Sequence, residues 1–264
     1  MSKKISLSVL LCSPDHYRVD YVINPWMKPG SVDVVQAKHQ WQTLVDTLVS
    51  LDVDVKVIPQ DPRFPDMVFA TDQGWIDGQQ VILSNLCFQE RKGESLIYQR
   101  WFEDHGYTVK SLGETCFEGG ECSPMGNKLF LGTGFRASSA AVPKLQQHVS
   151  QQVIPLELIK ANFYHLDTCF LPINDTTAFY YPSAFSSESQ MILQTEVSQL
   201  LEFTEAEAYG FAANSFAIGQ KMLIAKPNVT FARKLRDLGI EPIELDISEF
   251  IKAGGGIHCL ILPL

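Results

Sequence analysis

Residues Phe69–Ser84, FATDQGWIDGQQVILS, show the pattern that decides the fold: a short apolar run, a turn, and a second apolar run. Two such runs around a turn with Gly, Asn or Asp are typical of a β-hairpin. The pattern starts again at intervals of about 45 to 49 residues, which indicates a repeat architecture. The other copies are FEGGECSPMGNKLFLG (Phe117–Gly132), LDTCFLPINDTTAFYY (Leu166–Tyr181), FAANSFAIGQKMLIAK (Phe211–Lys226) and the shortened GIHCLILPL (Gly256–Leu264).

Segments with helical periodicity lie between these pairs of runs. Apolar residues of the segment 34–48 fall on one face at helical spacing. The segments 93–105 and 229–238 are each followed by a glycine, as helices often are, and the segment 188–202 carries a broad apolar face. The sequence therefore predicts an α/β fold in which a helix follows each strand pair.

The fifth pair lacks its second run, and the N-terminal run Ile5–Leu11 can supply it. Serines alternate there with Leu and Val, as in a strand. Lys3, Lys4 and Cys12 around this run superficially resemble a lipoprotein signal, but the apolar part is short for one. Pairing the two chain ends would complete a ring of five units. Because no Pro- or Ser-rich linker interrupts the series, we expect residues 1–264 to form a single domain.

The overall composition excludes several classes of partner. The formal net charge is −9, and no stretch is strongly basic, so a nucleic-acid partner is not expected. No segment has the 18 or more consecutive apolar residues of a membrane span. The six cysteines show no metal-ligand spacing, which favours a reduced, cytoplasmic protein without a metal or other cofactor.

Polar and reactive side chains gather at the start of each pair, in stretches that are otherwise apolar or rich in glycine. If the units surround a common axis, these starts meet at one central site. Buried carboxylates need a cationic partner. A metal site would favour several His or Cys ligands or Asp-rich loops, so a cationic small molecule fits this set better. The residues are Asp66, Asp72, Glu118, Glu121, His165, Asp167, Asn214, His258 and Cys259.

Four motifs in order resemble those of a known superfamily: PDMVFATD (Pro65–Asp72), FEGG (Phe117–Gly120), YHLDT (Tyr164–Thr168) and GGGIHC (Gly254–Cys259). YVINPWM (Tyr21–Met27) adds an N-terminal match. Together they resemble the guanidino-group-modifying, or pentein, superfamily. That group includes arginine and agmatine deiminases, dimethylarginine dimethylaminohydrolases, arginine dihydrolases and amidinotransferases. The resemblance implies a five-fold pseudosymmetric propeller of ββαβ units, in agreement with the repeat.

The resemblance also implies a role for each matching residue. Cys259 would be the nucleophile, His165 the general acid and base, and Glu118 the group that holds the imidazole. Asp72 and Asp167 would bind the guanidinium nitrogens, and Asp66 would support the loop that carries Asp72. A guanidinium is a poor electrophile, so a thiolate is required. The bound cation would stabilise that thiolate, while the paired carboxylates orient the planar group.

Arg136 lies in GTGFRASS (Gly132–Ser139), which resembles the segment that binds the substrate's α-carboxylate in the branches acting on amino acids. Its presence favours an α-amino acid over agmatine, which has no carboxylate. Such a contact would be bidentate, a geometry that lysine cannot reproduce. No second arginine for the carboxylate is evident in the sequence.

These features predict a cysteine-dependent hydrolase of arginine or an N-substituted arginine that releases citrulline with ammonia or an alkylamine. The partner would be a small guanidino amino acid, and a homodimer is compatible with the sequence. One alternative is amidino transfer to an amine. Another is a dihydrolase that yields ornithine, but similar dihydrolases read FTAN where this chain reads FATD, and Asp72 favours the deiminase-like reaction. A non-catalytic binding module is a further alternative.

Several residues near these motifs receive structural interpretations. Gly254, Gly255 and Gly256 would let the backbone approach the substrate and the sulfur. His258 would point to the opposite face of a strand from Cys259, and Asn214 would fix a turn. Glu121 would belong either to a turn or to the surroundings of the site, while Trp26 and Met27 would form either a lid or a packed loop. The other cysteines would be apolar fillers: Cys12, Cys87, Cys116, Cys122 and Cys169.

Overall fold

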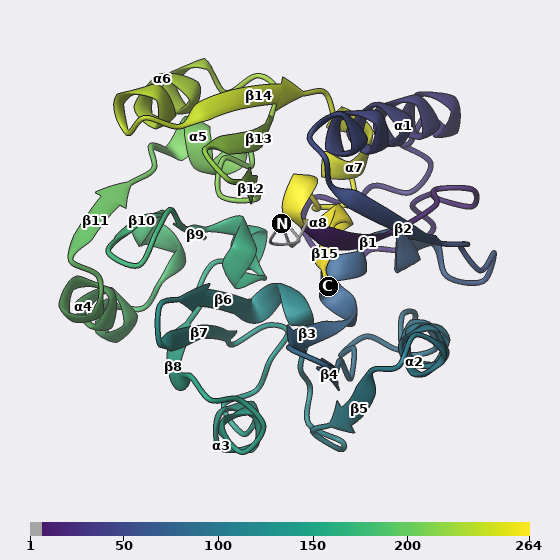
Figure 1. Ribbon diagram of the computed structural model, residues 1–264, viewed down its shortest axis with the longest axis horizontal. Coiled ribbons are helices and arrows are strands. Elements are labelled where there is room, and N and C mark those ends of the chain that lie inside the picture. Colours follow the sequence, from purple (N-terminus) through teal and green to yellow (C-terminus); the bar gives the residue numbers. More distant parts are fainter. Residues whose placement is uncertain (1–6) are drawn as a thin grey trace, which may run out of the picture.

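The computed structural model describes residues 7–264 and has a mixed α/β fold with five three-stranded sheets. Figure 1 shows these sheets around the short helix α8 (Ile257–Leu260), an arrangement that fits a pseudo-fivefold repeat. In each sheet the middle strand pairs antiparallel with one neighbour and parallel with the other. Each unit therefore has the strand, strand, helix, strand order that the resemblance implies.

Each of the five sheets contains three strands. They are β3 (Gly74–Asp77), β4 (Gln80–Leu83) and β5 (Thr108–Ser111); β6 (Cys122–Met125), β7 (Lys128–Thr133) and β8 (Gln152–Glu157); β9 (Phe170–Pro172), β10 (Thr177–Tyr180) and β11 (Gln199–Glu202); β12 (Phe216–Ile218), β13 (Lys221–Ala225) and β14 (Glu241–Leu245); and β15 (Leu262–Pro263), β1 (Ser8–Cys12) and β2 (Asp54–Ile58).

The helices connect the second and third strands or lie in the loops. The remaining α-helices are α1 (Val34–Ser50), α2 (Glu94–Asp104), α3 (Ala141–Gln146), α4 (Ser187–Glu196), α5 (Glu205–Tyr209), α6 (Val229–Asp237) and α7 (Ser248–Ile251). The short 3₁₀ helices are η1 (Pro65–Val68), η2 (Ala70–Gln73), η3 (Gly119–Glu121), η4 (Ala161–Phe163), η5 (Leu166–Thr168) and η6 (Pro182–Ala184). None of the helices in residues 7–264 has the length and apolar character needed to cross a bilayer.

The fifth unit joins the two ends of the chain, as the sequence predicts. Strand β1 pairs antiparallel with β15, with Val9 opposite Pro263, and parallel with β2. The amide of Leu264 also donates to the carbonyl of Ser8 over 2.9 Å. The first two residues of the predicted strand, Ile5 and Ser6, and the basic pair before them lie outside the described residues.

The helix predictions are confirmed for α1, α2 and α6, and that for 188–202 is wrong beyond residue 196. Gly106 and Gly239 have φ of 82° and 77°, the conformation that ends α2 and α6. Helix α4 stops at Glu196, and residues 199–202 form β11 beside β10. The apolar residues after the helix therefore belong to an edge strand, because backbone pairing with β10 outweighs their helical spacing.

The hairpin turns explain the recurring glycines. Gly78, Gly126 and Gly219 each have φ of 59°, a conformation that favours glycine at tight turns. The turn between β9 and β10 has no glycine. There the side chain of Asn174 accepts hydrogen bonds from the amides of Thr176 and Thr177 and closes the turn instead.

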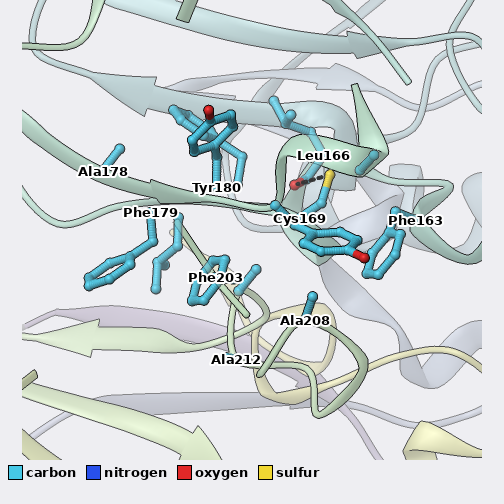
Figure 2. Packing of buried hydrophobic residues seen from close by; sticks show 14 of the residues in the cluster. Phe163, Leu166, Cys169, Ala178, Phe179, Tyr180, Phe203, Ala208 and Ala212 are labelled. Atoms are coloured by element: carbon cyan, nitrogen blue, oxygen red, sulfur yellow. Dashed lines mark hydrogen bonds between the residues drawn. The ribbon is translucent and has the colours of Figure 1, made fainter. Parts of the chain in front are cut away.

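Among the described residues, the largest buried hydrophobic cluster spans the second, third and fourth units. Figure 2 shows aromatic residues, including Phe179 and Phe203, packed there with small residues such as Ala208 and Ala212. Cys169 belongs to this cluster, and its thiol lies 3.6 Å from the carbonyl oxygen of Leu166. Its environment agrees with the filler interpretation.

Candidate active site

The candidate site lies where one-turn helices precede the first strands of successive units. Asp72 lies on η2, Asp167 on η5 and Cys259 on α8, and Glu118 immediately precedes η3. The hydroxyl of Thr71 lies 2.7 Å from the carbonyl oxygen of His258, which ties η2 to α8. These turns direct side chains from different units to one buried place. The prediction that His258 and Cys259 point to opposite faces of a strand is wrong, because both residues lie on helix α8.

Cys259 is buried, with contacts to two polar side chains. Its Sγ lies 3.4 Å from Oδ2 of Asp167. The side-chain amide of Asn214 donates to the same sulfur over 3.1 Å, and its Oδ1 accepts from the amide of Cys259 over 3.1 Å. Asn214 therefore does more than fix a turn, which is the interpretation from the sequence.

His165 lies between two carboxylates. Its Nε2 is 2.8 Å from Oε2 of Glu118, and its Nδ1 is 3.5 Å from Oδ1 of Asp72. Glu118 is thus placed to hold the imidazole, as the resemblance implies. All three side chains are buried, so little water screens these interactions.

The charges of this group support one another. Burial lowers the pKa of His165, but the charge of Asp72 and the bond to Glu118 outweigh it and raise the pKa to about 9. Burial raises the pKa of Glu118, but Arg136 and His165 outweigh that effect and hold it well below its ordinary value. At neutral pH the structure therefore favours an imidazolium beside an ionised glutamate.

Arg91 is the site residue that the sequence interpretation missed. Its Nη1 lies 2.7 Å from Oδ2 of Asp72, and its Nη2 lies 2.9 Å from Oε2 of Glu94 and 3.2 Å from the carbonyl oxygen of Asp66. The guanidinium is 3% exposed. In the sequence it lies in the charged stretch QERKGES, which is typical of a solvated loop, so no local signal indicates its burial.

Arg136 is buried beside the catalytic candidates and is not a surface charge. Its guanidinium lies between the rings of Phe88 and Tyr164, at 4.5 and 4.6 Å. Nη1 lies 3.3 Å from Oε2 of Glu118, and Nη2 donates to the carbonyl of Ile23 over 3.1 Å. These contacts place Arg136 as a partner of Glu118, and its role at a substrate carboxylate stays a prediction.

Four carboxylate oxygens of the predicted site residues have no hydrogen-bond partner: Oε1 of Glu121 and Oδ1 of Asp66, Asp72 and Asp167. Of these acids, Asp72 and Asp167 are the two that approach His165 and Cys259. The other oxygen of each residue is occupied, by Arg91 and by His258 respectively. The 3.5 Å separation from Nδ1 of His165 leaves Oδ1 of Asp72 without a hydrogen bond. Buried acceptors without partners are costly. A planar cation with several N–H donors would satisfy both.

The thiol of Cys259 is not activated without a ligand. Burial raises its pKa well above the ordinary value, and the charges of Asp167 and Asp72 raise it further. A cation bound to these carboxylates would offset both charges and favour the thiolate.

Two further acids stabilise the loops of the site. Oδ2 of Asp66 accepts from the hydroxyl of Tyr21 over 2.9 Å, and its carbonyl oxygen contacts Arg91, which links it to Asp72. Its supporting role at the loop of Asp72 stays a prediction. Oε2 of Glu121 accepts from the amide of Leu166, which begins η5. Burial raises the pKa of Asp66 to about 6 and that of Glu121 to about 8.

Gly256 and Gly120 let side chains approach the backbone. A Cβ atom on Gly256 would lie 2.7 Å from Oδ1 of Asn214. A Cβ atom on Gly120 would lie 3.0 Å from both Oδ1 of Asp72 and Nδ1 of His165. The missing Cβ atoms of Gly256 and Gly120 therefore leave room for polar side chains of the protein itself.

Trp26 and Met27 form a packed loop in this structure. Met27 is buried, and Nε1 of Trp26 donates to the carbonyl of Asn162 over 2.9 Å. The ring of Trp26 lies 4.8 Å from that of Phe211. Of the two predicted roles, the packed loop is the one that these contacts support.

Among the described residues, Asp72, Glu118 and His165 form the group that could hold a metal ion, with their ligand atoms within 4.8 Å of one another. Arg91 and Arg136 already pair with the two carboxylates. A metal ion would have to displace these ion pairs, so the arrangement fits an organic cation at the remaining oxygens better.

Residues 17–264 match the model of one family, described as eukaryotic N,N dimethylarginine dimethylhydrolase. This match covers nearly the whole described chain. The chain belongs to the dimethylarginine dimethylaminohydrolase family. The resemblance to the guanidino-group-modifying superfamily is thereby confirmed.

The relatives of this chain carry two kinds of name. The chain is 37% identical, over 96% of its own length, to the bifunctional arginine dihydrolase/ornithine cyclodeaminase AgrE of Nostoc sp.. It is 32% identical over 95% of its length to a dimethylarginine dimethylaminohydrolase of Mycobacterium tuberculosis, of which it covers 83%. These are names of hydrolases of C–N bonds in amidines, the enzyme class that the sequence predicts. The chain spans 37% of the length of AgrE and of ArgZ of Synechocystis sp..

A solved structure agrees with the fold along the chain. The N-terminal domain of ArgZ, an arginine dihydrolase from the cyanobacterial ornithine-ammonia cycle, superposes with a TM-score of 0.94 at 33% identity, covering 98% of both chains. That structure is of a cysteine-to-serine variant bound to substrate. The match supports the mixed α/β fold and the five small sheets of this family member.

Proposed function

We propose that the protein hydrolyses the guanidinium group of arginine or an N-substituted arginine, with Cys259 as the nucleophile. The observation that supports this best is the buried cluster of Cys259, His165, Asp72 and Asp167, in which one oxygen of each aspartate lacks a partner. A guanidinium has the charge, flat shape and N–H donors that would satisfy those oxygens.

In the proposed reaction the bound substrate cation favours loss of the Cys259 thiol proton to solvent. The resulting thiolate attacks the guanidinium carbon. The S–C bond forms and the adduct becomes tetrahedral. His165, protonated at neutral pH, gives its proton to the departing nitrogen as the C–N bond breaks, so ammonia or an alkylamine leaves. His165 then takes a proton from water, whose oxygen attacks the covalent intermediate and releases citrulline and the thiol.

The family relatives support two outcomes of this chemistry. Dimethylarginine dimethylaminohydrolases and arginine dihydrolases are both among them. We favour a single hydrolysis to citrulline because Asp72 occupies the position where the similar dihydrolases read asparagine. The dihydrolase outcome, ornithine and two molecules of ammonia per arginine, is the second candidate because AgrE and ArgZ carry that name.

We also propose that residues 1–264 form a single domain in which the five sheets close into a propeller around the site. The pairing of β1 with β15 and the superposition on the ArgZ domain support this arrangement. A closed ring would place the starts of the units around the substrate's guanidinium group.

A substrate panel tests the proposal. The purified chain is incubated with arginine, mono- and dimethylarginine and agmatine, with and without glycine, and citrulline, ornithine, ammonia and alkylamines are measured. We expect citrulline from an α-amino acid substrate. Ornithine would establish the dihydrolase, and a glycine-dependent amidino product would establish the transferase.

Two cysteine variants make the panel specific. Cys259→Ser should abolish turnover, whereas Cys169→Ser, at a buried cysteine in the aromatic cluster, should keep it. If no guanidino compound is converted while the protein stays folded, the proposal is wrong and a binding role becomes the better interpretation.

A further inference from the structure

His258 contacts the same carboxylate oxygen as the sulfur of Cys259. Its Nδ1 lies 2.9 Å from Oδ2 of Asp167, and Sγ of Cys259 lies 3.4 Å from that oxygen. An ionised carboxylate only accepts, so Nδ1 is the donor in this bond. With Oδ2 occupied in this way, Oδ1 of Asp167 is the oxygen left buried and without a partner.

The backbone of His258 is fixed on both sides. Its carbonyl oxygen accepts from the hydroxyl of Thr71, and its amide donates to the carbonyl of Asn214 over 3.1 Å. The ring of Phe216 packs near the imidazole, with centroids 6.3 Å apart. The imidazole is therefore held in place by residues that do not belong to the catalytic group.

A hollow of about 350 Å³ lies next to this imidazole. It is lined by first-strand residues such as Trp75, Phe170 and Phe216, and Asp167 and His258 also line it. The side chain of His258 is 25% exposed, against 6% for Asp167. Both side chains therefore border the hollow, and the imidazole covers Oδ2 of Asp167 through its hydrogen bond.

We propose that His258 is a positioning residue that acts through Asp167. It holds Oδ2 by this hydrogen bond and thereby presents Oδ1 to the substrate's guanidinium group. Without this bond the carboxylate could rotate or be hydrated from the hollow, and its alignment with a planar cation would be lost. This inference rests on the proposed function, because it assigns Asp167 to cation binding.

Alkylation of Cys259 by two small reagents tests the inference without turnover. The rates with 2-chloroacetamidine, a planar cation, and with neutral iodoacetamide are measured at Cys259 by peptide mass spectrometry. Their ratio reports cation binding next to the sulfur. For His258→Leu we expect the ratio to fall about ten-fold or more, since a charge-assisted hydrogen bond aligns the carboxylate.

Three comparisons separate positioning from a structural effect. His258→Asn places an amide donor near the Nδ1 position and should restore most of the ratio. His39→Leu, at an exposed histidine of α1, should not change it. If arginine is turned over, His258→Leu should raise KM while the thermal midpoint stays close to that of the wild type.

The inference and the proposed function fail in different ways. Equal alkylation ratios in the wild type and His258→Leu would overturn the inference. A loss that His258→Asn does not restore would also overturn it, because the effect would not depend on the donor. A wild type with a strong preference for 2-chloroacetamidine that converts no guanidino compound would overturn only the proposed hydrolysis.

Discussion

His165 shows how individual residues of the site depend on one another. It is buried and yet carries a raised pKa, because Asp72 and Glu118 supply negative charge on both sides. Arg91 and Arg136 in turn neutralise those two acids. The charges alternate in a network, so the loss of one member leaves another buried and unpaired.

The first prediction concerns the pH dependence of stability. The folded pKa of His165 is about 9, against about 6.5 for an unperturbed histidine. Its contribution to stability is therefore complete below about pH 6.5 and is lost as the pH rises through 9, by an amount on the order of 3 kcal/mol. We expect urea unfolding at several pH values to show a steeper decline for the wild type than for His165→Gln.

Exposed His39 provides the control for that experiment. His39→Gln should keep the decline of the wild type. Parallel curves for the wild type and His165→Gln would show that His165 is not held protonated in the folded protein.

The second prediction concerns Arg91. Arg91→Met leaves Asp72 and Glu94 buried without their cation, which should lower the free energy of unfolding by about 3–5 kcal/mol. Arg63→Met removes the partner of Asp61 from an exposed, solvent-screened pair and should leave the free energy of unfolding nearly unchanged. Urea denaturation of both variants checks the difference, and similar losses for the two would contradict the assigned pairing.

At the scale of elements, the ends of helices and turns follow from local chemistry. Asp33 precedes α1, and its Oδ1 accepts from the amides of Val35 and Gln36, each over 3.0 Å. Glycines at positive φ end α2 and α6. The cap and the terminal glycines act on residues nearby in the chain, so their effect does not depend on the unit in which they occur.

The third prediction concerns the cap of α1. Asp33→Ala should lower the free energy of unfolding by about 1 kcal/mol, because two amides of the first turn lose their acceptor. Asp46→Ala, at an exposed position in the same helix, should change it by less than about 0.5 kcal/mol. Thermal or urea unfolding distinguishes the two. An equal effect would mean that the cap contributes nothing specific.

At the scale of the whole molecule, the ends of the chain belong to one sheet. Strand β15 completes the unit that begins with β1, and Figure 1 shows both near α8. Helix α8 carries Cys259. The helix that carries the nucleophile candidate therefore leads directly into a sheet built from both ends of the chain. The cytoplasmic location and the homodimer are not tested by these observations and stay predictions.

The fourth prediction follows from this shared sheet. A circular permutant that links the two ends and opens the chain between Gly113 and Glu114, in an exposed turn, should fold and keep its activity. Opening it after Leu166, inside buried η5, should abolish both. Circular dichroism and citrulline formation check this. If the permutant opened between Gly113 and Glu114 does not fold, the prediction is wrong, because joining the two ends of the chain would then not preserve the fold.

Much of the fold and part of the site could be predicted from the sequence. The hairpins, the helices after them and the pairing of the two ends follow from short-range patterns and from the period of the units. The motifs also predicted Cys259, His165, Glu118, Asp72 and Asp167, which the structure brings together. The edge strand after α4 was missed because its apolar residues also fit a helix.

The sequence by itself determined the repeating units and the chemical groups at their starts, because both depend on residues that are close together in the chain. Only the tertiary structure decided which charges meet. Arg91 with Asp72, Arg136 with Glu118 and His258 with Asp167 are pairs from separate segments. Their energies depend on burial and distance, which local sequence does not specify.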